Sequence, residues 1–266
     1  MTQIANARCI VTGGARGMGR LFGERLLRRG CQVALIDVAK DALEETRAQL
    51  ARLGTVHAFV GDMADGPDVY RVAGEAVDAL GGVDLLINNA GVVTGGALTD
   101  VSDERHALTY LVNTLGVVRM TRAVLPAMIA GRGGHVVNIA SAAGLTAVPL
   151  QTTYCSSKWA VVGFSEALAL ELTHLGHPIG VTTVCPSFVD TGMFEGVKPP
   201  MLVPMLRPED VVDRTLVAVE KDEPMLVMPL MAKQIPWMRA VLPRRLLAFL
   251  NDRLGVNRSM ETWRGH

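Results

Sequence analysis

The chain is poor in aromatic residues, in cysteine and in net charge. Aromatic residues make up 5 % of the 266 residues, there are 4 cysteines, and 26 basic side chains balance 26 acidic ones. A balanced charge creates no global field that would attract nucleic acid, so a nucleic-acid partner is not expected. The cysteines form neither a CxxC pair nor a cluster with histidine, which indicates reduced, buried thiols and no metal site.

Long hydrophobic runs are also missing. No stretch approaches the roughly 20 apolar residues that span a bilayer, and the segment from Met1 to Asn6 does not resemble a secretory signal. These features lead us to expect a cytoplasmic protein. The sequence has no serine- or glycine-rich linker and no repeat, which predicts one domain over residues 1–266.

What the chain does have is a regular alternation of short apolar runs with longer amphipathic ones. Runs that are apolar on both faces and separated by helices indicate a parallel sheet buried on both sides, and so a doubly wound, Rossmann-like α/β fold. Residues 186–206 contain four prolines and no clear period, which predicts a mobile substrate loop. We expect strands near residues 8–12, 31–37, 56–60, 83–87, 135–139, 181–185 and 225–228.

A glycine-rich turn follows the first predicted strand. Residues 12–19 read TGGARGMG, and a helix begins directly afterwards. Glycines at such a strand–helix turn allow the backbone to approach a pyrophosphate, which the free N–H groups of the helix can bind. We therefore expect this turn to hold a dinucleotide through Gly13, Ala15, Arg16, Gly17, Met18 and Gly19.

Three further strand ends are candidates for the same site. Asp37 ends the second strand, where a carboxylate can accept hydrogen bonds from the adenosine ribose and would repel a 2′-phosphate, so NAD is favoured over NADP. Arg16 favours NADP instead, because its guanidinium can pair with a phosphate group. Asp62 and Met63 follow the third strand and are expected near adenine, although Asp62 can equally be a helix cap. Small residues after the fourth strand complete the predicted site: Asn89, Ala90 and Gly91.

A second group of residues suggests proton-transfer chemistry. Tyr154 and Lys158 lie four apart on a predicted helix and so share one face. A nearby ammonium, together with a cationic nicotinamide ring, is expected to lower the phenol pKa, so that Tyr154 can exchange a proton with an alcohol or a carbonyl. Ser141 can hydrogen-bond the substrate oxygen. Asn113 is expected to hold a water that links Lys158 to solvent.

Taken together, these motifs resemble those of the short-chain dehydrogenase/reductase family. TGGARGMG is similar to its TGxxxGxG loop, residues 88–91 to its NNAG and YCSSK to its YxxxK, with Asn113 and Ser141 completing a catalytic tetrad. The resemblance implies oxidation of secondary alcohols or reduction of ketones, and a homo-oligomer. It also implies that Pro186, Val189 and Thr191 contact the nicotinamide. The family usually has Pro-Gly after the sixth strand, whereas here Ser187 follows Pro186, which alters substrate fit near the ring.

The expected substrate pocket is mostly apolar. Its members follow predicted strands or lie in the mobile loop: Val93, Ser141, Ala143, Val148, Leu150, Met193 and Phe194. Such a lining suggests a lipophilic alcohol or ketone, such as a steroid, a retinoid or a long-chain alcohol. The alternative is that these residues only pack the loop.

Residues 233–254 form an apolar and basic stretch that is broken by Pro243. We interpret it as a helical extension. It can lie on a membrane surface, where a lipophilic substrate would enter, cover the pocket, or pack against another subunit.

Two alternatives to an NAD-dependent dehydrogenase remain at this point. One is an NADP-dependent carbonyl reductase. The other is a non-catalytic protein that binds nicotinamide nucleotides, against which the paired Tyr154 and Lys158 argue. A sugar-nucleotide epimerase would need a substrate domain for which 266 residues leave no room.

Overall fold

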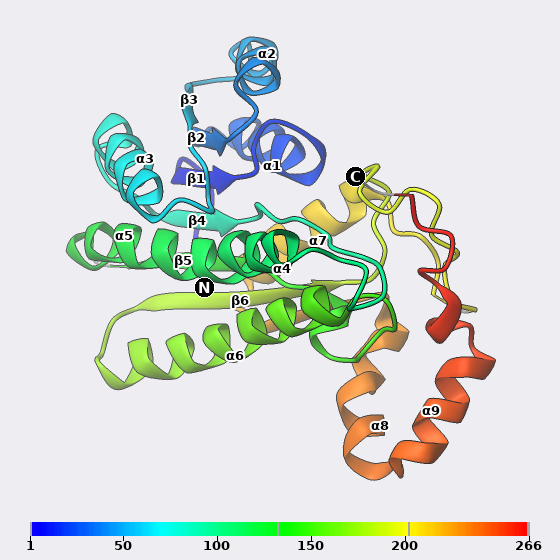
Figure 1. Ribbon diagram of the computed structural model, residues 1–266. Coiled ribbons are helices and arrows are strands. Elements are labelled where there is room, and N and C mark those ends of the chain that lie inside the picture. The colour runs from blue at the N-terminus through cyan, green and yellow to red at the C-terminus, as the bar shows by residue number, and fades with distance from the viewer. Residues whose placement is uncertain (1, 132, 202, 265–266) are drawn as a thin grey trace.

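The computed structural model describes residues 2–131, 133–201 and 203–264. Within these ranges the predicted doubly wound fold is confirmed: the strands form one parallel sheet in the order β3-β2-β1-β4-β5-β6-β7 (Figure 1). Each strand lies close to its predicted position. The apolar runs of the other strands are mostly buried, whereas β3 at the edge of the sheet is only half-buried. The strands are β1 (Arg8–Thr12), β2 (Gln32–Asp37), β3 (Val56–Val60), β4 (Leu85–Asn88), β5 (Gly134–Ile139), β6 (Ile179–Pro186) and β7 (Met225–Met228).

Alternate strand residues face two separate cores. Val11 and Leu35 point to the side that is covered by α1 (Gly17–Leu27), α2 (Lys40–Leu50) and α7 (Pro208–Glu220). Ile10 and Leu86 point to the other side, against α3 (Gly66–Leu80), α5 (Val117–Ala130) and α6 (Thr152–His174). Because both faces are covered, the polar ends of the strands remain as the place where a ligand can approach the sheet.

The connection between β4 and α5 contains a short helix and a wider turn. Ser102 caps α4 (Asp103–Tyr110) by accepting from the Arg105 N–H. The chain then widens into a π-helical turn, η1 (Leu111–Gly116), before α5 begins. Hydrophobic periodicity cannot reveal one wider turn, and such turns often occur at functional positions.

The strand order defines where a ligand is expected. From β1 the chain proceeds outward to β2 and β3, and then returns to β4 on the other side of β1. The crossover helices of the two halves therefore diverge between β1 and β4 and leave a crevice at the carboxyl ends of these strands. The glycine turn follows β1, and Asn89 to Gly91 follow β4, so both line this crevice.

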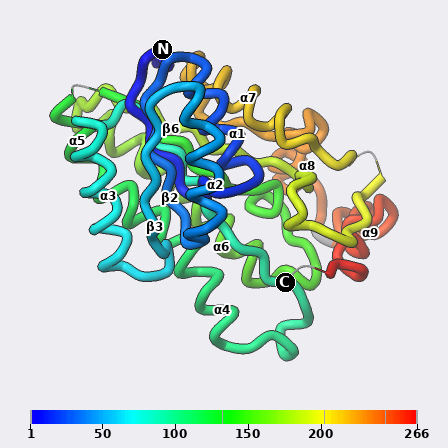
Figure 2. The backbone as a smooth tube through the Cα atoms, turned by 90° about the horizontal axis from the view of Figure 1, so that it is seen from above, coloured from blue at the N-terminus to red at the C-terminus, as the bar shows by residue number. Residues whose placement is uncertain are grey.

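The C-terminal part of the chain lies beside the sheet. Helices α8 (Ile235–Val241) and α9 (Arg244–Arg253) stand apart from the sandwich at the carboxyl-end edge of the sheet (Figure 1), and the tube view shows them next to the loop that follows β6 (Figure 2). Residue 202 of the predicted 186–206 loop lies outside the described residues. Among those that are described, no helix is both long and apolar enough to cross a membrane.

Candidate active site

The glycine turn is built so that only glycine fits at two of its positions. Gly13 has φ +65°, and a Cβ there would lie 2.9 Å from Ala90 Cα. A Cβ on Gly19 would lie 1.9 Å from the Gly13 carbonyl oxygen. These approaches bring the start of α1 against the loop after β4, and they leave no space for a side chain.

The start of α1 is free to bind an anion. Arg16 precedes the helix without a side-chain cap hydrogen bond, and the first turn contains no acidic residue. Helix N-terminal N–H groups without a cap, together with the positive end of the helix dipole, form an anion site. A cavity opens directly in front of this turn, and Gly13, Ala15, Arg16, Gly17 and Met18 line it.

Asp37 lies at one end of the same cavity. Its Oδ2 accepts from the Ala15 N–H at 3.0 Å, and its Oδ1 accepts from the Ala39 N–H at 2.9 Å. The two backbone hydrogen bonds fix the carboxylate at the carboxyl end of β2. A negative charge held there favours a ribose diol and opposes a 2′-phosphate.

The loop after β4 is attached to the glycine turn through Thr12. The Thr12 hydroxyl oxygen accepts from the N–H groups of Asn89 and Ala90, both at 3.0 Å, and Asn89 Nδ2 donates to the Thr12 carbonyl at 2.9 Å. Asn89, Ala90 and Gly91 thereby form one wall of the cavity. Thr12 was not among the residues expected from the sequence to act in the site. Its position at the end of a predicted strand is the feature that could have indicated this role.

The structure does not place every predicted cofactor residue on this cavity. Asp62 and Met63 lie after β3 and do not line it. Asp62 Oδ1 instead accepts from the Ala64 N–H at 2.8 Å in a local turn, while Met63 is buried. Gly19 acts through packing, as described above. The hydrogen bond from the Ala64 N–H to Asp62 fits the alternative role of Asp62 as a loop residue.

Tyr154 and Lys158 lie on the first turns of α6 and face the opposite end of the cavity. Lys158 Nζ lies 5.9 Å from the centroid of the Tyr154 ring and donates to the Ile139 carbonyl at 2.8 Å. That carbonyl is the last of β5, so the strand end fixes the ammonium beside the phenol. The side chains of both residues are almost entirely buried.

Burial shifts both pKa values away from those of the free side chains. It raises the pKa of Tyr154 to about 12, and the Ser141 hydroxyl opposes this only in part. It lowers the pKa of Lys158 to about 8. In the protein without a nucleotide, loss of solvation outweighs the neighbouring groups. The lowering of the phenol pKa by the ammonium together with a cationic nicotinamide ring stays a prediction. A lower pKa for Tyr154 would require a further positive charge close to its phenol ring.

Asn113 lies in the π-helical turn η1 and is fully buried. Its Oδ1 accepts from the Val92 N–H at 2.8 Å, and its Nδ2 donates to the Val92 carbonyl and to Ser157 Oγ. A Cβ on Gly91 would lie 3.2 Å from Asn113 Oδ1 and 3.5 Å from Lys158 Nζ, so the two side chains meet around Gly91. The water expected at Asn113 stays a prediction.

Ser141 follows β5 and lies between two cavities. Its Oγ accepts from the Ala143 N–H at 3.1 Å and lies 3.4 Å from the Pro186 carbonyl, to which it donates. Ser187, which replaces the usual glycine, also lies on both cavities, and its hydroxyl is buried without a hydrogen-bond partner among the described residues. The loop after β6 places Pro186, Val189 and Thr191 along the cofactor cavity.

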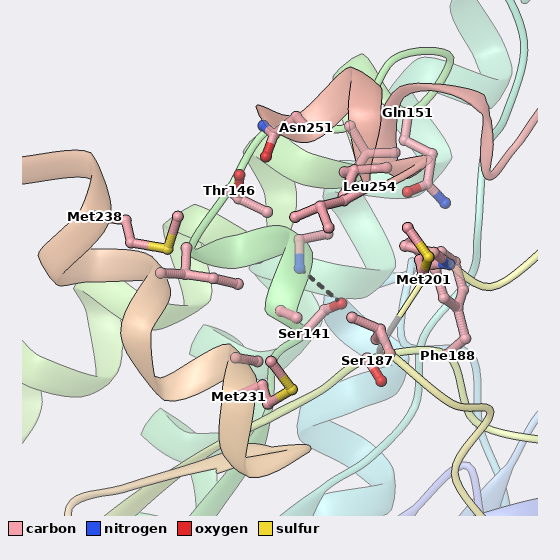
Figure 3. Close-up of a pocket in the computed structure, with 18 of the residues that line it drawn as sticks. Ser141, Thr146, Gln151, Ser187, Phe188, Met201, Met231, Met238, Asn251 and Leu254 are labelled. Carbon is pink, nitrogen blue, oxygen red and sulfur yellow. Dashed lines mark hydrogen bonds between the residues drawn. The ribbon is translucent and has the colours of Figure 1, made fainter. Parts of the chain in front are cut away.

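The second cavity is apolar and begins at Ser141 and Tyr154. Figure 3 shows Ser141 and Ser187 at the lower side of it with Met231 beside Ser141, while Met238 and Leu254, also from the C-terminal segment, lie to the left and above. Of the predicted substrate residues, Ala143, Val148 and Phe194 line this cavity, Met193 lines only the cofactor cavity, and Val93 and Leu150 line neither. The lining residues that were not expected from the sequence are Ala142, Thr146, Gln151, Phe188, Pro200, Met201, Val203, Met231, Ala232, Ile235, Met238, Leu247, Asn251, Leu254 and Val256.

This combination of fold, glycine turn and paired Tyr154 and Lys158 defines a class of oxidoreductases. The family model described as short chain dehydrogenase matches residues 7–201. The chain therefore belongs to the short-chain dehydrogenase family.

Comparison with individual proteins supports the assignment over nearly the whole chain. The sequence is 39 % identical to epidermal retinol dehydrogenase 2 of Mus musculus, covering 99 % of this chain and 87 % of that protein. It is 36 % identical to estradiol 17-beta-dehydrogenase 11 of Mus musculus, covering 96 % and 86 %. The structure resembles a short chain dehydrogenase/reductase from Burkholderia phymatum, solved in complex with NAD, with a TM-score of 0.80, 29 % identity and coverage of 97 % and 98 %.

Proposed function

We propose that the protein is an NAD(H)-dependent dehydrogenase that interconverts a lipophilic secondary alcohol and its ketone. The observation that carries this proposal is that two cavities meet at Ser141 and Tyr154. One adjoins the N-terminus of α1, and the other is lined mainly by apolar side chains. Named relatives act on retinol and estradiol, and the similar Burkholderia phymatum structure contains NAD. Estradiol carries a lipophilic secondary alcohol and so supports this substrate class for the chain, whereas retinol is a primary alcohol and supports only the lipophilic character. The NAD complex supports the cofactor.

The cavity in front of α1 offers a suitable group for each part of a dinucleotide. The free N–H groups of α1 suit the pyrophosphate, Asp37 suits the adenosine ribose, and the loop from Pro186 to Thr191 lies where a nicotinamide would extend toward Tyr154. When bound, the cofactor would accept or supply the hydride.

The residues around Tyr154 would handle the proton. In the oxidation direction, the phenolate oxygen of Tyr154 takes the proton from the substrate hydroxyl, while Ser141 Oγ hydrogen-bonds the same substrate oxygen. Lys158 stabilises the phenolate by its charge, held in place by the Ile139 carbonyl. Burial alone raises the pKa of the Tyr154 phenol, so a bound oxidised nicotinamide would have to add its positive charge to that of Lys158 for the phenolate to form near neutral pH.

We also propose that the protein acts at a membrane surface in a reducing compartment, such as the cytoplasm. Apolar side chains on the C-terminal segment stay exposed beside Arg245 and Arg253: Leu230, Met231, Trp237, Val241, Leu246 and Phe249. Such a surface suits the interface of an anionic bilayer, and the four free cysteines suit reducing conditions. Co-sedimentation with phosphatidylserine-containing vesicles tests this, and full recovery in the supernatant would refute it.

A homo-oligomer is the final part of the proposal. The exposed apolar side chains Leu108, Tyr110 and Leu115 lie on α4 and η1 and offer a face for a second copy. Light scattering after size exclusion tests it, and a monomeric mass at micromolar concentration would contradict it.

The decisive experiment measures absorbance of reduced nicotinamide with purified protein and either NAD or NADP. Retinol, estradiol and 2-decanol are compared with the polyol sorbitol. Oxidation of a lipophilic alcohol with NAD supports the proposal. Activity confined to sorbitol would overturn the lipophilic class, and tight NAD binding without turnover of any alcohol would favour a non-catalytic nucleotide-binding role.

A further inference from the structure

Trp263 belongs to the C-terminal segment that follows α9, and its indole lies against the loop that follows β4. A Cβ built on Gly95 of that loop would lie 2.7 Å from Cε3 of the indole and 2.8 Å from Cζ3, so the ring lies directly against Gly95. The loop is itself held in place, because the Gly96 N–H donates to the Leu150 carbonyl at 2.8 Å. One edge of Trp263 therefore contacts a fixed part of the protein.

The same segment is hydrogen-bonded to a turn in the loop that follows β6. This turn, residues 193–196, belongs to neither a helix nor a strand. Hydrogen bonds join successive residues of the C-terminal segment to carbonyl groups of the turn: Trp263 Nε1 donates to Met193 at 3.1 Å, Thr262 Oγ1 to Gly196 at 2.6 Å, and the Arg264 N–H to Glu195 at 2.9 Å. Because the turn is not part of the sheet, its position depends on these contacts with the C-terminal segment.

The turn places Phe194 where the two cavities meet. Phe194 lines both cavities, and its ring lies edge-on to that of Tyr154, with centroids 6.4 Å apart and an angle of 79° between the rings. Phe188, which lines the apolar cavity, makes a second edge-on contact with Phe194 at 5.3 Å. Trp263 is not among the described residues that line either cavity, so it can influence a ligand only through the residues that it holds.

We propose that Trp263 is a positioning residue for the alcohol substrate: it holds the turn 193–196 so that Phe194 forms a fixed wall beside Tyr154. A wall that is already ordered binds a ligand more tightly than one that the ligand must order, because ordering a side chain on binding costs free energy. The inference rests on the proposed function, since the ligand that it concerns is the lipophilic alcohol that binds at Tyr154. It assigns a part in substrate binding to a residue that lies outside both cavities.

The first test follows the oxidation of 2-decanol at saturating NAD. Trp263→Ala removes the ring and its donor, whereas Trp263→Phe keeps a ring but loses the donor. KM should rise at least about fivefold in Trp263→Ala and by a smaller factor in Trp263→Phe, while kcat should fall by less than about threefold because Tyr154 and Lys158 are untouched. Glu261→Ala is the matched control, because it changes an exposed side chain of the same segment. An unchanged KM in Trp263→Ala, or an equal rise in Glu261→Ala, overturns the proposal.

Gly95→Ala disturbs the same contact without altering Trp263. The methyl group would lie 2.7 Å from the indole, too close for both to keep their places, and Gly95 is not among the described residues that line either cavity. KM should therefore rise by a factor similar to that of Trp263→Ala. In a protein that already carries Trp263→Ala, the same substitution should have no further effect, because the ring is gone. Equal effects of Gly95→Ala in both proteins would overturn the proposal.

Phe194→Ala shows whether Trp263 acts through Phe194. In a protein that carries Phe194→Ala, adding Trp263→Ala should raise KM by less than about twofold, since the wall that Trp263 holds is already missing. A tryptophan that only stabilises the fold would raise KM by the same factor whether or not Phe194 is present. Independent, multiplying effects of the two substitutions would therefore refute a positioning role.

Binding measured without turnover separates this inference from the proposed function. Calorimetry gives the Kd for 2-decanol in the Tyr154→Phe protein saturated with NAD, with and without Trp263→Ala. If the protein with Tyr154 intact oxidises the alcohol but Trp263→Ala changes neither KM nor this Kd, the function stands and the role of Trp263 is refuted. If Trp263→Ala raises the Kd at least about fivefold but no alcohol is oxidised, the role of Trp263 stands and the function is refuted. If 2-decanol binds to neither protein, both are refuted.

Discussion

The two cavities that meet at Tyr154 are built in different ways. The cofactor cavity is formed by strand ends and their adjoining turns, and backbone hydrogen bonds hold residues such as Asp37 and Asn89 in place. The far wall of the substrate cavity consists mostly of apolar side chains from α8, α9 and the residues on either side of these helices. The first is therefore fixed by the sheet, whereas the second depends on how a peripheral segment packs.

This contrast predicts that the rate of the chemical step and the affinity for substrate can be changed by different substitutions.

The largest effect on activity is expected at Tyr154, where the two cavities meet. Tyr154→Phe removes the group that exchanges a proton with substrate and should lower kcat by about 10²- to 10⁴-fold. The Kd for NAD, measured by calorimetry, should change by less than about threefold, because the cavity walls stay in place. Retention of more than a tenth of the activity would show that another group transfers the proton.

Burial of Lys158 should make the stability of the protein depend on pH. Its pKa is lowered to about 8 in the folded protein from 10.5. Between these values the unfolded chain binds the proton and the folded protein does not, so stability should rise with pH. From pH 7 to pH 9.5 we expect the free energy of unfolding to increase by on the order of 2 kcal/mol relative to a Lys158→Met variant. Urea titrations at several pH values measure this.

The opposite slope is expected above pH 10. There the unfolded chain loses the Tyr154 proton while the folded protein retains it up to a pKa of about 12, so stability falls.

The Lys158 prediction would be contradicted if the free energy of unfolding of the wild type and of Lys158→Met changed in parallel between pH 7 and 9.5. Parallel curves would mean that the Lys158 ammonium is solvated in solution.

Asp37 tests whether the cofactor cavity sets the choice of nucleotide. Asp37→Asn keeps the shape of the side chain and removes its negative charge. The variant should no longer repel the 2′-phosphate of NADP, because two negative charges in close contact are costly. The ratio of kcat/KM with NAD to kcat/KM with NADP should therefore fall by roughly tenfold. Asp62→Asn is the matched control, because Asp62 also follows a strand but lies off the cavity. An equal change in both variants would point to a general charge effect.

The smallest effect is expected in the peripheral segment. Arg239 attaches α8 to the rest of the protein by donating to the Leu145 carbonyl at 2.6 Å and by lying 4.2 Å from the Trp159 ring centroid. Arg239→Ala should raise KM for a lipophilic alcohol about threefold to tenfold through loss of these contacts, with the Kd for NAD unchanged. Arg253→Ala removes a similar cation contact within α9 and should have no such effect.

The two regions also differ in how far the sequence could predict them. Strands that are buried on both faces and the turn at Gly13 to Gly19 depend on local patterns, so the fold and most cofactor residues could be located from spacing. The wider turn at Asn113 has no signature in the periodicity. Met201, Met238 and Leu254 reach the cavity through packing between distant segments, which no short motif encodes. Leu150 adopts φ +63° and lines neither cavity, which a pattern of apolar residues could not reveal.

Four residues, Ser141, Tyr154, Ser187 and Phe194, line both cavities. A molecule in the apolar cavity therefore covers the Tyr154 side of the cofactor cavity. Asp37 and the glycine turn line the cofactor cavity alone, so a dinucleotide can contact them without disturbing the apolar wall. The consequence concerns order of addition: the nucleotide should bind first and leave last. Product inhibition by NADH should then be competitive against NAD, and the ketone should be a noncompetitive inhibitor against NAD.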